Sequence, residues 1–131
     1  MKRNRGTLFP RRYFRIPFEK PVEFSILKYN RRYIAHLSTK RGPGKGHDIG
    51  EDGLSFVSPY SLPVDMVLRV VFELPDIGEQ RILARVVRSG PVDAGFLTAV
   101  QFLNLHGQRK ERLRDYIASE TRKSYRFLKF L

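Results

Sequence analysis

The stretch LRVVFEL, residues 68–74, carries large apolar side chains at every second position, with Arg69 and Glu73 on the opposite parity. Successive side chains of a β-strand point to opposite faces of the sheet. The alternation therefore predicts a strand with one buried face and one solvated face. Because a lone strand or hairpin is marginally stable in water, its partners must come from the rest of the chain.

Five other stretches have a similar β-branched or aromatic character. They are residues 22–26, 32–37, 54–57, 82–88 and 96–102. Turn-forming residues bound them, and we expect Asp76-Ile77-Gly78 and Ser89-Gly90-Pro91 to be hairpin connections. Six short strands at this spacing predict a single mainly β domain, either a barrel or a sandwich. Closing the sheet into a barrel would also remove its exposed edges.

A helix is predicted after the last strand, where the spacing of apolar residues changes from two to nearly four. Leu113, Tyr116 and Ile117 then share one helical face. Asn104 is a suitable N-cap, because its side chain can accept a hydrogen bond from a free backbone N–H of the first turn. We therefore expect one C-terminal helix that begins at about residue 105.

The composition excludes several kinds of site. The chain of 131 residues has no cysteine, so it forms neither disulfides nor thiolate metal sites. His36, His47 and His106 stand apart from one another without metal-ligand spacing, so no metal or cofactor is expected. No apolar stretch approaches the length of a membrane span, and the basic N-terminus leads into no signal-peptide core. We expect a soluble, unsecreted, cytoplasmic protein.

Positive charge is concentrated in the first third of the chain. Lys and Arg outnumber Asp and Glu by 13 to 2 in residues 1–45, but only by 12 to 11 in residues 46–131. This asymmetry favours a polyanionic ligand that meets the N-terminal end of the molecule. The aromatic and basic residues 125–131 either contact a partner or a membrane surface, or cap the open end of the barrel.

Two other motifs carry little chemistry. The glycine-rich stretch of residues 42–46 faintly resembles a phosphate-binding loop. However, Lys45 is followed by glycine instead of the Ser or Thr that binds magnesium, and no helix follows. We expect a long, mobile hairpin tip there. Glu51 and Asp52 are adjacent carboxylates, which usually point apart in a turn, and no nucleophile or base partner lies near them in sequence. No enzymatic activity is expected.

A cluster of arginines is the strongest chemical signal. Arg11, Arg12 and Arg15 lie between Pro10 and Pro17, which disfavour a helix and favour an extended segment. In extended backbone Arg11 and Arg15 point the same way, so two guanidinium groups can surround one ligand. Arginine suits phosphate oxygens and the O6/N7 edge of guanine.

A polar turn, residues 48–53, complements these arginines. The carboxylate of Asp48 can accept from the N1/N2 edge of guanine, so the two elements together indicate a guanine nucleotide. Gly53 is needed there either for a positive φ or because the backbone must approach another group closely.

Arg11-x-x-x-Arg15 and Asp48-x-Gly50-x-x-Gly53, followed by the later strands and the helix, resemble the PilZ domain family over nearly the whole chain. The resemblance implies a six-stranded antiparallel barrel with a C-terminal helix that binds cyclic di-GMP. It implies that Arg11 and Arg15 contact phosphate and the guanine Hoogsteen edge, with Arg12 as a further phosphate contact. It also implies that Asp48 reads the other guanine edge and that Gly53 makes the tight turn.

Gly50 stands where the family has a serine in the ligand-binding turn. A neutral hydrogen bond contributes about 0.5–1.5 kcal/mol, so this change should weaken binding by about tenfold or less.

The expected function is therefore that of a receptor. Residues 1–17 form a basic, flexible segment ahead of one domain, residues 18–131, and cyclic di-GMP orders that segment as its phosphates neutralise the arginines. By family resemblance, a downstream protein in motility, envelope or polysaccharide control reads the new surface. Two alternatives remain: a PilZ-like protein adaptor that has lost its ligand, and a nucleic-acid-binding barrel that uses the basic, aromatic N-terminal third.

Overall fold

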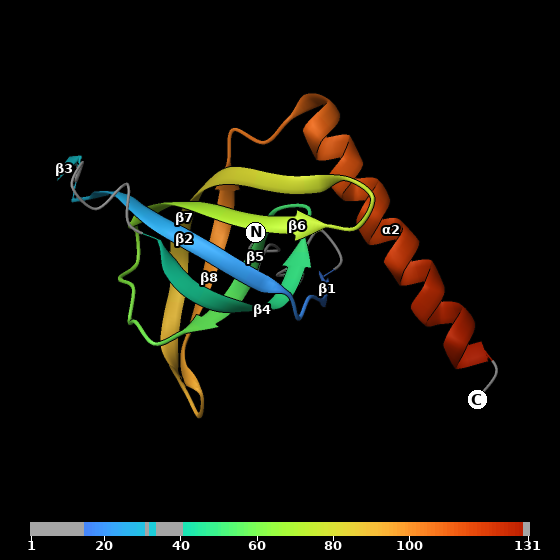
Figure 1. Ribbon diagram of the computed structural model, residues 1–131, viewed down its shortest axis with the longest axis horizontal. Helices are drawn as coiled ribbons and strands as arrows, with labels where there is room; N and C mark the ends of the chain where they lie inside the picture. The colour runs from blue at the N-terminus through green and yellow to red at the C-terminus, as the bar shows by residue number, and fades with distance from the viewer. Residues whose placement is uncertain (1–14, 31, 34–40, 130–131) are drawn as a thin grey trace, which may run out of the picture.

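The computed structural model describes residues 15–30, 32–33 and 41–129, which form a β-barrel followed by a long helix (Figure 1). In chain order the elements are β1 (Arg15–Pro17), β2 (Pro21–Tyr29), β3 (Arg32–Tyr33), β4 (Gly42–Gly50), β5 (Gly53–Ser58), β6 (Val67–Leu74), β7 (Gly78–Val92), β8 (Gly95–Leu103) and α2 (Gly107–Lys129). Within this range the fold is mainly β with one C-terminal helix, as predicted.

Six strands close the barrel. Their order is β4-β5-β8-β7-β6-β2, and pairing of β2 with β4 completes the ring, with every pair antiparallel. The remaining strands are short extensions: β3 pairs with β2, and β1 pairs with β4. β1 and β2 occupy the same edge of β4, because Arg15 lies opposite Gly50 and Pro21 lies opposite Lys45. β1 thus lies inside the segment of residues 1–17 that was expected to be flexible, and the rest of that segment lies outside the described residues.

The glycine-rich stretch of residues 42–46 is not a hairpin tip, and this prediction was wrong. It is the first half of β4, paired with both β2 and β5. The glycines are required by packing: a Cβ at Gly42 would lie 2.5 Å from the ring of Phe24, and one at Gly44 would lie 2.9 Å from the ring of Phe56. The expected strand of residues 32–37 is described only at its first two residues, and the rest lies outside the described residues.

One of the two predicted hairpin connections is correct. Asp76-Ile77-Gly78 joins β6 to β7, with φ of 67° at Asp76 and 100° at Gly78. Ser89-Gly90-Pro91 lies inside β7 instead, where Gly90 pairs with Leu97. The sheet tolerates this proline because pairing of β6 with β7 ends at Arg85, and in the described part of the chain no strand lies along the outer edge of β7 beyond that point. The true turn is Asp93-Ala94.

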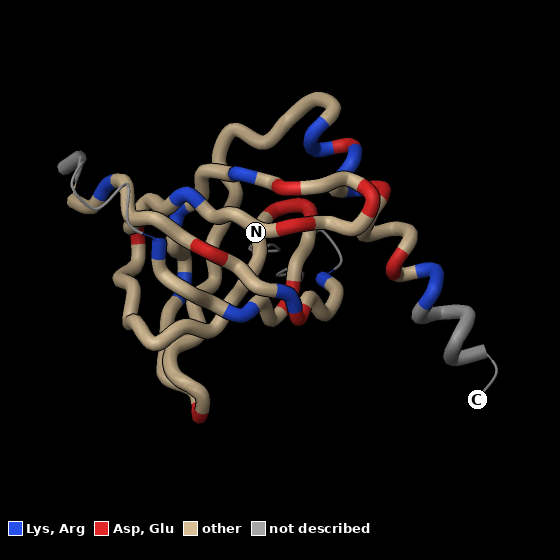
Figure 2. The backbone as a smooth tube through the Cα atoms, in the orientation of Figure 1, with Lys and Arg blue, Asp and Glu red and all other residues tan. Residues whose placement is uncertain are grey.

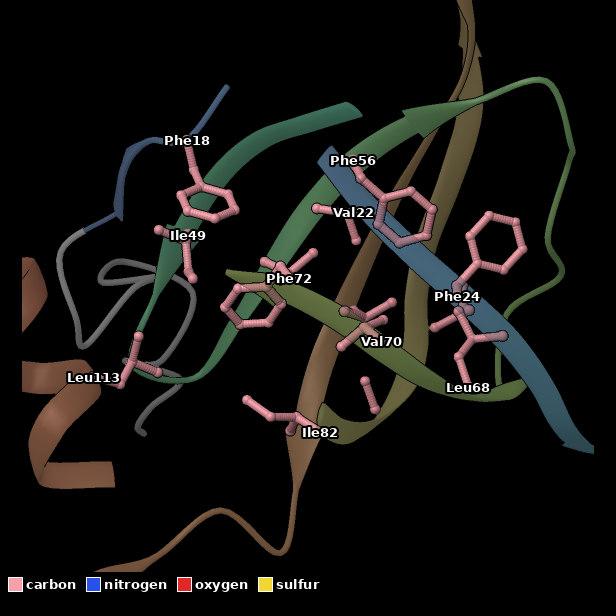
Figure 3. Close-up of a cluster of buried hydrophobic side chains, with 14 of the residues drawn as sticks. Phe18, Val22, Phe24, Ile49, Phe56, Leu68, Val70, Phe72, Ile82 and Leu113 are labelled. Carbon is pink, nitrogen blue, oxygen red and sulfur yellow. The ribbon is translucent and has the colours of Figure 1, made fainter. Parts of the chain in front are cut away.

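The inward faces of the strands form one apolar core. Figure 3 shows the rings of Phe18, Phe56 and Phe72 pointing into the space between the strands, together with aliphatic side chains from β2 and β6. Phe18 lies in the connection between β1 and β2, whereas the core side chains of β2, β5 and β6 alternate along their strands with outward-facing residues. Phe18 and Phe72 meet edge to face with ring centroids 5.5 Å apart.

Helix α2 packs against one end of this core and then runs past the barrel (Figure 1). Leu113 and Ile117 are buried and Tyr116 packs beside them, so the predicted apolar face is confirmed. Asn104 is not the N-cap: it lies three residues before α2 with a left-handed φ of 55°, and it shapes the turn that leaves β8. Side chains from residue 124 onward lie outside the described part, and no helix described is long and apolar enough to cross a membrane.

Candidate functional site

The pairing of β1 with β4 places Arg15 at the centre of the candidate site. Its Nη2 donates to Oδ1 of Asp48 at 2.9 Å, and its Nη1 donates to Oδ1 of Asp52 at 3.0 Å. Only 13% of the Arg15 side chain is exposed, and its Nε is buried with no hydrogen-bond partner among the described residues. The guanidinium group is thus held in one orientation by two carboxylates.

Asp48 is fixed from a second direction by Ser55. The hydroxyl Oγ of Ser55 donates to Oδ1 of Asp48 at 2.8 Å, and the two residues are cross-strand partners in β4 and β5. Leu54 and Phe56 point into the core, so Ser55 and its partner lie on the outer face of the barrel. This carboxylate is therefore pre-oriented at the surface, close to the arginine.

The two glycines of the motif have different surroundings. Gly50 is buried opposite Arg15 in the β1–β4 ladder. Gly53 is the first residue of β5 and has no positive φ; a Cβ there would lie 2.0 Å from the carbonyl oxygen of Val100. Of the two predicted reasons for Gly53, close approach is correct, and the group approached is the backbone of β8.

Glu51 and Asp52 form the turn between β4 and β5, and their side chains point apart as predicted. Asp52 accepts from Arg15, whereas Oε1 of Glu51 accepts from Nε of Arg114 on α2 at 3.0 Å. The side chain of Glu51 is only 16% exposed. The ion pair between Glu51 and Arg114 therefore links the β4–β5 turn, which carries the candidate site, to α2.

The sequence interpretation missed Asp52, Ser55 and the Glu51–Arg114 pair as members of this arrangement. A two-residue turn centred on residues 51 and 52 pairs residue 48 with residue 55 by simple counting. That signal was available for Ser55. The choice of Arg114 depends on how α2 crosses the end of the barrel, which no local pattern encodes.

The remaining candidates are quickly placed. Arg11, Arg12 and His36 lie outside the described residues. Across the described ranges no three His, Cys, Asp or Glu side chains are grouped so that they could bind a metal. Asp and Glu positions are most frequent at the barrel end where α2 packs, where Lys and Arg positions also lie (Figure 2). Arg15 reaches into this acidic end, which explains its two carboxylate partners.

A family model of the PilZ domain matches residues 10–119. The chain belongs to the PilZ domain family. No curated protein matches the chain in sequence.

Three solved structures have the same fold as this PilZ domain. YcgR from Escherichia coli, in complex with c-di-GMP, superposes with a TM-score of 0.70 at 18% identity, over 91% of this chain and 49% of that one. The Bacillus subtilis inhibitor of motility MotI/DgrA gives 0.70 at 15% identity, over 86% and 52%. The K. pneumonia MrkH–c-di-GMP complex gives 0.66 at 16%, over 88% and 53%. The chain thus spans about half the length of these three proteins.

Within this PilZ domain, the part of the predicted motif that the structure describes comes together in space. Arg15 contacts Asp48 directly, and Gly50 and Gly53 flank the turn that carries Asp52. The geometry supplies one cation and one oriented carboxylate at the same point on the barrel surface.

Proposed function

We propose that this PilZ domain is a receptor for cyclic di-GMP, which binds at Arg15 and Asp48 while Arg11 and Arg12 supply further phosphate contacts. The observation that carries the proposal is the 2.9 Å contact between the guanidinium of Arg15 and the carboxylate of Asp48. Guanine presents acceptors at O6/N7 and donors at N1/N2, so an arginine and a carboxylate at one point match its two edges. The solved YcgR and MrkH structures contain c-di-GMP.

Binding requires Arg15 to exchange one of its partners. Asp52 is the more exposed carboxylate, at 44% against 22% for Asp48. A partly exposed ion pair contributes roughly 0.2–1 kcal/mol, so a ligand phosphate displaces Asp52 at small cost. Asp48 keeps its hydrogen bond from Ser55 and remains oriented toward the base. Arg15 then donates to the ligand from a position that β1 already fixes.

Titration calorimetry tests the proposal. The wild-type chain is expected to bind cyclic di-GMP with micromolar affinity or tighter and to reject cyclic di-AMP. A hydrogen bond to a charged group contributes about 1.5–3 kcal/mol, so Arg15→Ala and Asp48→Ala should each weaken binding by at least about tenfold. Arg122→Ala, which removes the same charge from the exposed face of α2, should bind as the wild type does. Absence of heat at about 100 μM ligand would refute the receptor function.

We further propose that the ligand signals by ordering the part of residues 1–17 that precedes β1, because its phosphates neutralise the arginines collected in this segment. The ordered segment would present a new surface to a downstream protein in motility, envelope or polysaccharide control, in the bacterial cytoplasm. Hydrogen exchange of residues 1–17 should slow when cyclic di-GMP is added. It should not slow in Arg15→Ala at the same ligand concentration, and equal exchange in the wild type with and without ligand would contradict this mechanism.

A second candidate is a protein adaptor that binds no nucleotide. Two observations favour it: Gly50 lacks the hydroxyl of the family serine, and Arg15 is already neutralised by two carboxylates. The same titration separates the two candidates, since an adaptor gives no heat with cyclic di-GMP although the protein is folded.

A further inference from the structure

A hollow lies on the outer face of the barrel beside the Arg15–Asp48 site. Its volume is about 520 Å³, which is within the usual range of small-molecule sites. The lining side chains that matter below are Glu19, Lys45, His47 and Val57, and the turn between β7 and β8 closes one side through Ala94.

The hollow and the candidate site share one surface. Lys45 and Val57 are cross-strand partners one outward-facing step along β4 and β5 from the partners Asp48 and Ser55. His47 lines the hollow and directly precedes Asp48, at the bulge between Gly46 and Asp48. A ligand held at Asp48 therefore meets the rim of the hollow without crossing another element.

The hollow repeats the chemistry of the first site. It offers a cation, Lys45, and a carboxylate, Glu19, both exposed. Neither forms an ion pair with another residue in the described part of the chain. Val57 adds a half-buried apolar surface between them. A guanylate needs a cation for its phosphate, an acceptor for N1–H and N2–H, and an apolar surface for its ring.

We propose that this hollow binds a second guanylate, with Lys45 at the phosphate, Glu19 at the N1/N2 edge and Val57 against the base. The inference rests on the proposed receptor function and deepens it. The second guanylate is the distal half of the cyclic di-GMP held at Asp48, or half of a second molecule stacked on it. Both sources present the same chemistry, and the stoichiometry of binding separates them.

Calorimetry of Lys45→Ala with cyclic di-GMP tests the phosphate contact. Loss of one charged hydrogen bond should weaken binding by at least about tenfold. If one molecule spans both sites, the stoichiometry stays at one per chain; if two molecules bind, it falls from two to one. Lys28→Ala is the matched control, because Lys28 is exposed on β2 and does not line the hollow. It should leave affinity and stoichiometry unchanged.

The base contact is tested with 3′,3′-cyclic GMP–AMP, which carries one guanine and one adenine. If Asp48 reads one guanine and Glu19 reads the other, the wild type should bind this mixed dinucleotide several-fold more weakly than cyclic di-GMP. Glu19→Ala should remove that preference, because adenine has no N1–H or N2 amino group for a carboxylate to accept from. A merely structural role of Glu19 would not change base selectivity.

Three results would overturn the inference. If the wild type binds but Lys45→Ala matches Lys28→Ala, the second site is absent while the receptor function stands. If Lys45→Ala binds weakly but the wild type does not distinguish the mixed dinucleotide, the hollow does not read guanine. If the wild type binds no cyclic di-GMP at about 100 μM, both proposals fail.

Discussion

A methyl group at residue 53 would collide with the backbone of the neighbouring strand. The contact would be 2.0 Å from the carbonyl oxygen of Val100, and a main-chain atom of a paired strand cannot rotate away. We predict that Gly53→Ala lowers the free energy of unfolding by about 3 kcal/mol. Gly90→Ala is the control: nothing lies within 4 Å of a Cβ there, so its change should stay within about 0.5 kcal/mol. Urea denaturation measures both, and equal stabilities would show that β5 and β8 separate freely.

Single residues were predictable where their chemistry is specific. Arg15 and Asp48 could be chosen because a guanidinium fork and a carboxylate suit a guanylate wherever they lie. Ser55 and Asp52 were missed because serine and aspartate are common, and their importance comes from the register that places them beside Asp48 and Arg15. Whether these residues contact a ligand stays a prediction.

Among the described residues, Tyr116 on helix α2 has a pKa that is clearly shifted. Burial against the barrel end, with a smaller contribution from Glu120, raises the pKa of Tyr116 above 10.0. The folded protein thus favours the neutral phenol. The resulting stability is complete below pH 10 and is lost as the pH rises through the folded pKa, because the unfolded chain ionises first.

Tyr116→Phe should therefore lose less stability between pH 8 and about pH 11 than the wild type does. Glu120→Gln should fall between the two, since burial is the larger cause. Urea midpoints at the two pH values are the measurement. If the wild type and Tyr116→Phe decline in parallel, the environment of Tyr116 does not differ between the folded and unfolded states.

At the level of elements, prediction succeeded where side chains alternate and failed where they are absent. Leu68, Val70 and Phe72 revealed β6, because a half-buried strand places apolar groups at every second position. β4 was missed because its first half, residues 42–46, has almost no side chains to alternate. Gly42 and Gly44 leave room for the rings of Phe24 and Phe56, which are distant in sequence.

The whole molecule carries a net charge of +12, which suits either a nucleotide or a nucleic acid as ligand. The salt dependence of binding distinguishes the two. A cyclic dinucleotide has two phosphates, so log K should fall with log salt concentration at a slope of about −2 or less steeply. A protein that neutralises six backbone phosphates shows a slope of about −5. We predict the shallow slope with cyclic di-GMP and weak, steeply salt-dependent binding to single-stranded DNA. Calorimetry from 50 to 300 mM NaCl decides, and tight DNA binding at 300 mM would contradict the prediction.

The closed ring of six strands does not include β1. Among the described residues three pairs join β1 to β4, and Ile16 and Phe18 bury this segment in the core. Loss of the three pairs would leave every pairing within the ring intact. A pull on the N-terminus would thus unzip this short ladder first and carry Arg15 away from both carboxylates. The cation and the carboxylates of the candidate site therefore lie on different segments of the chain, and we expect a load on the N-terminus to separate them before the pairings of the closed ring are lost.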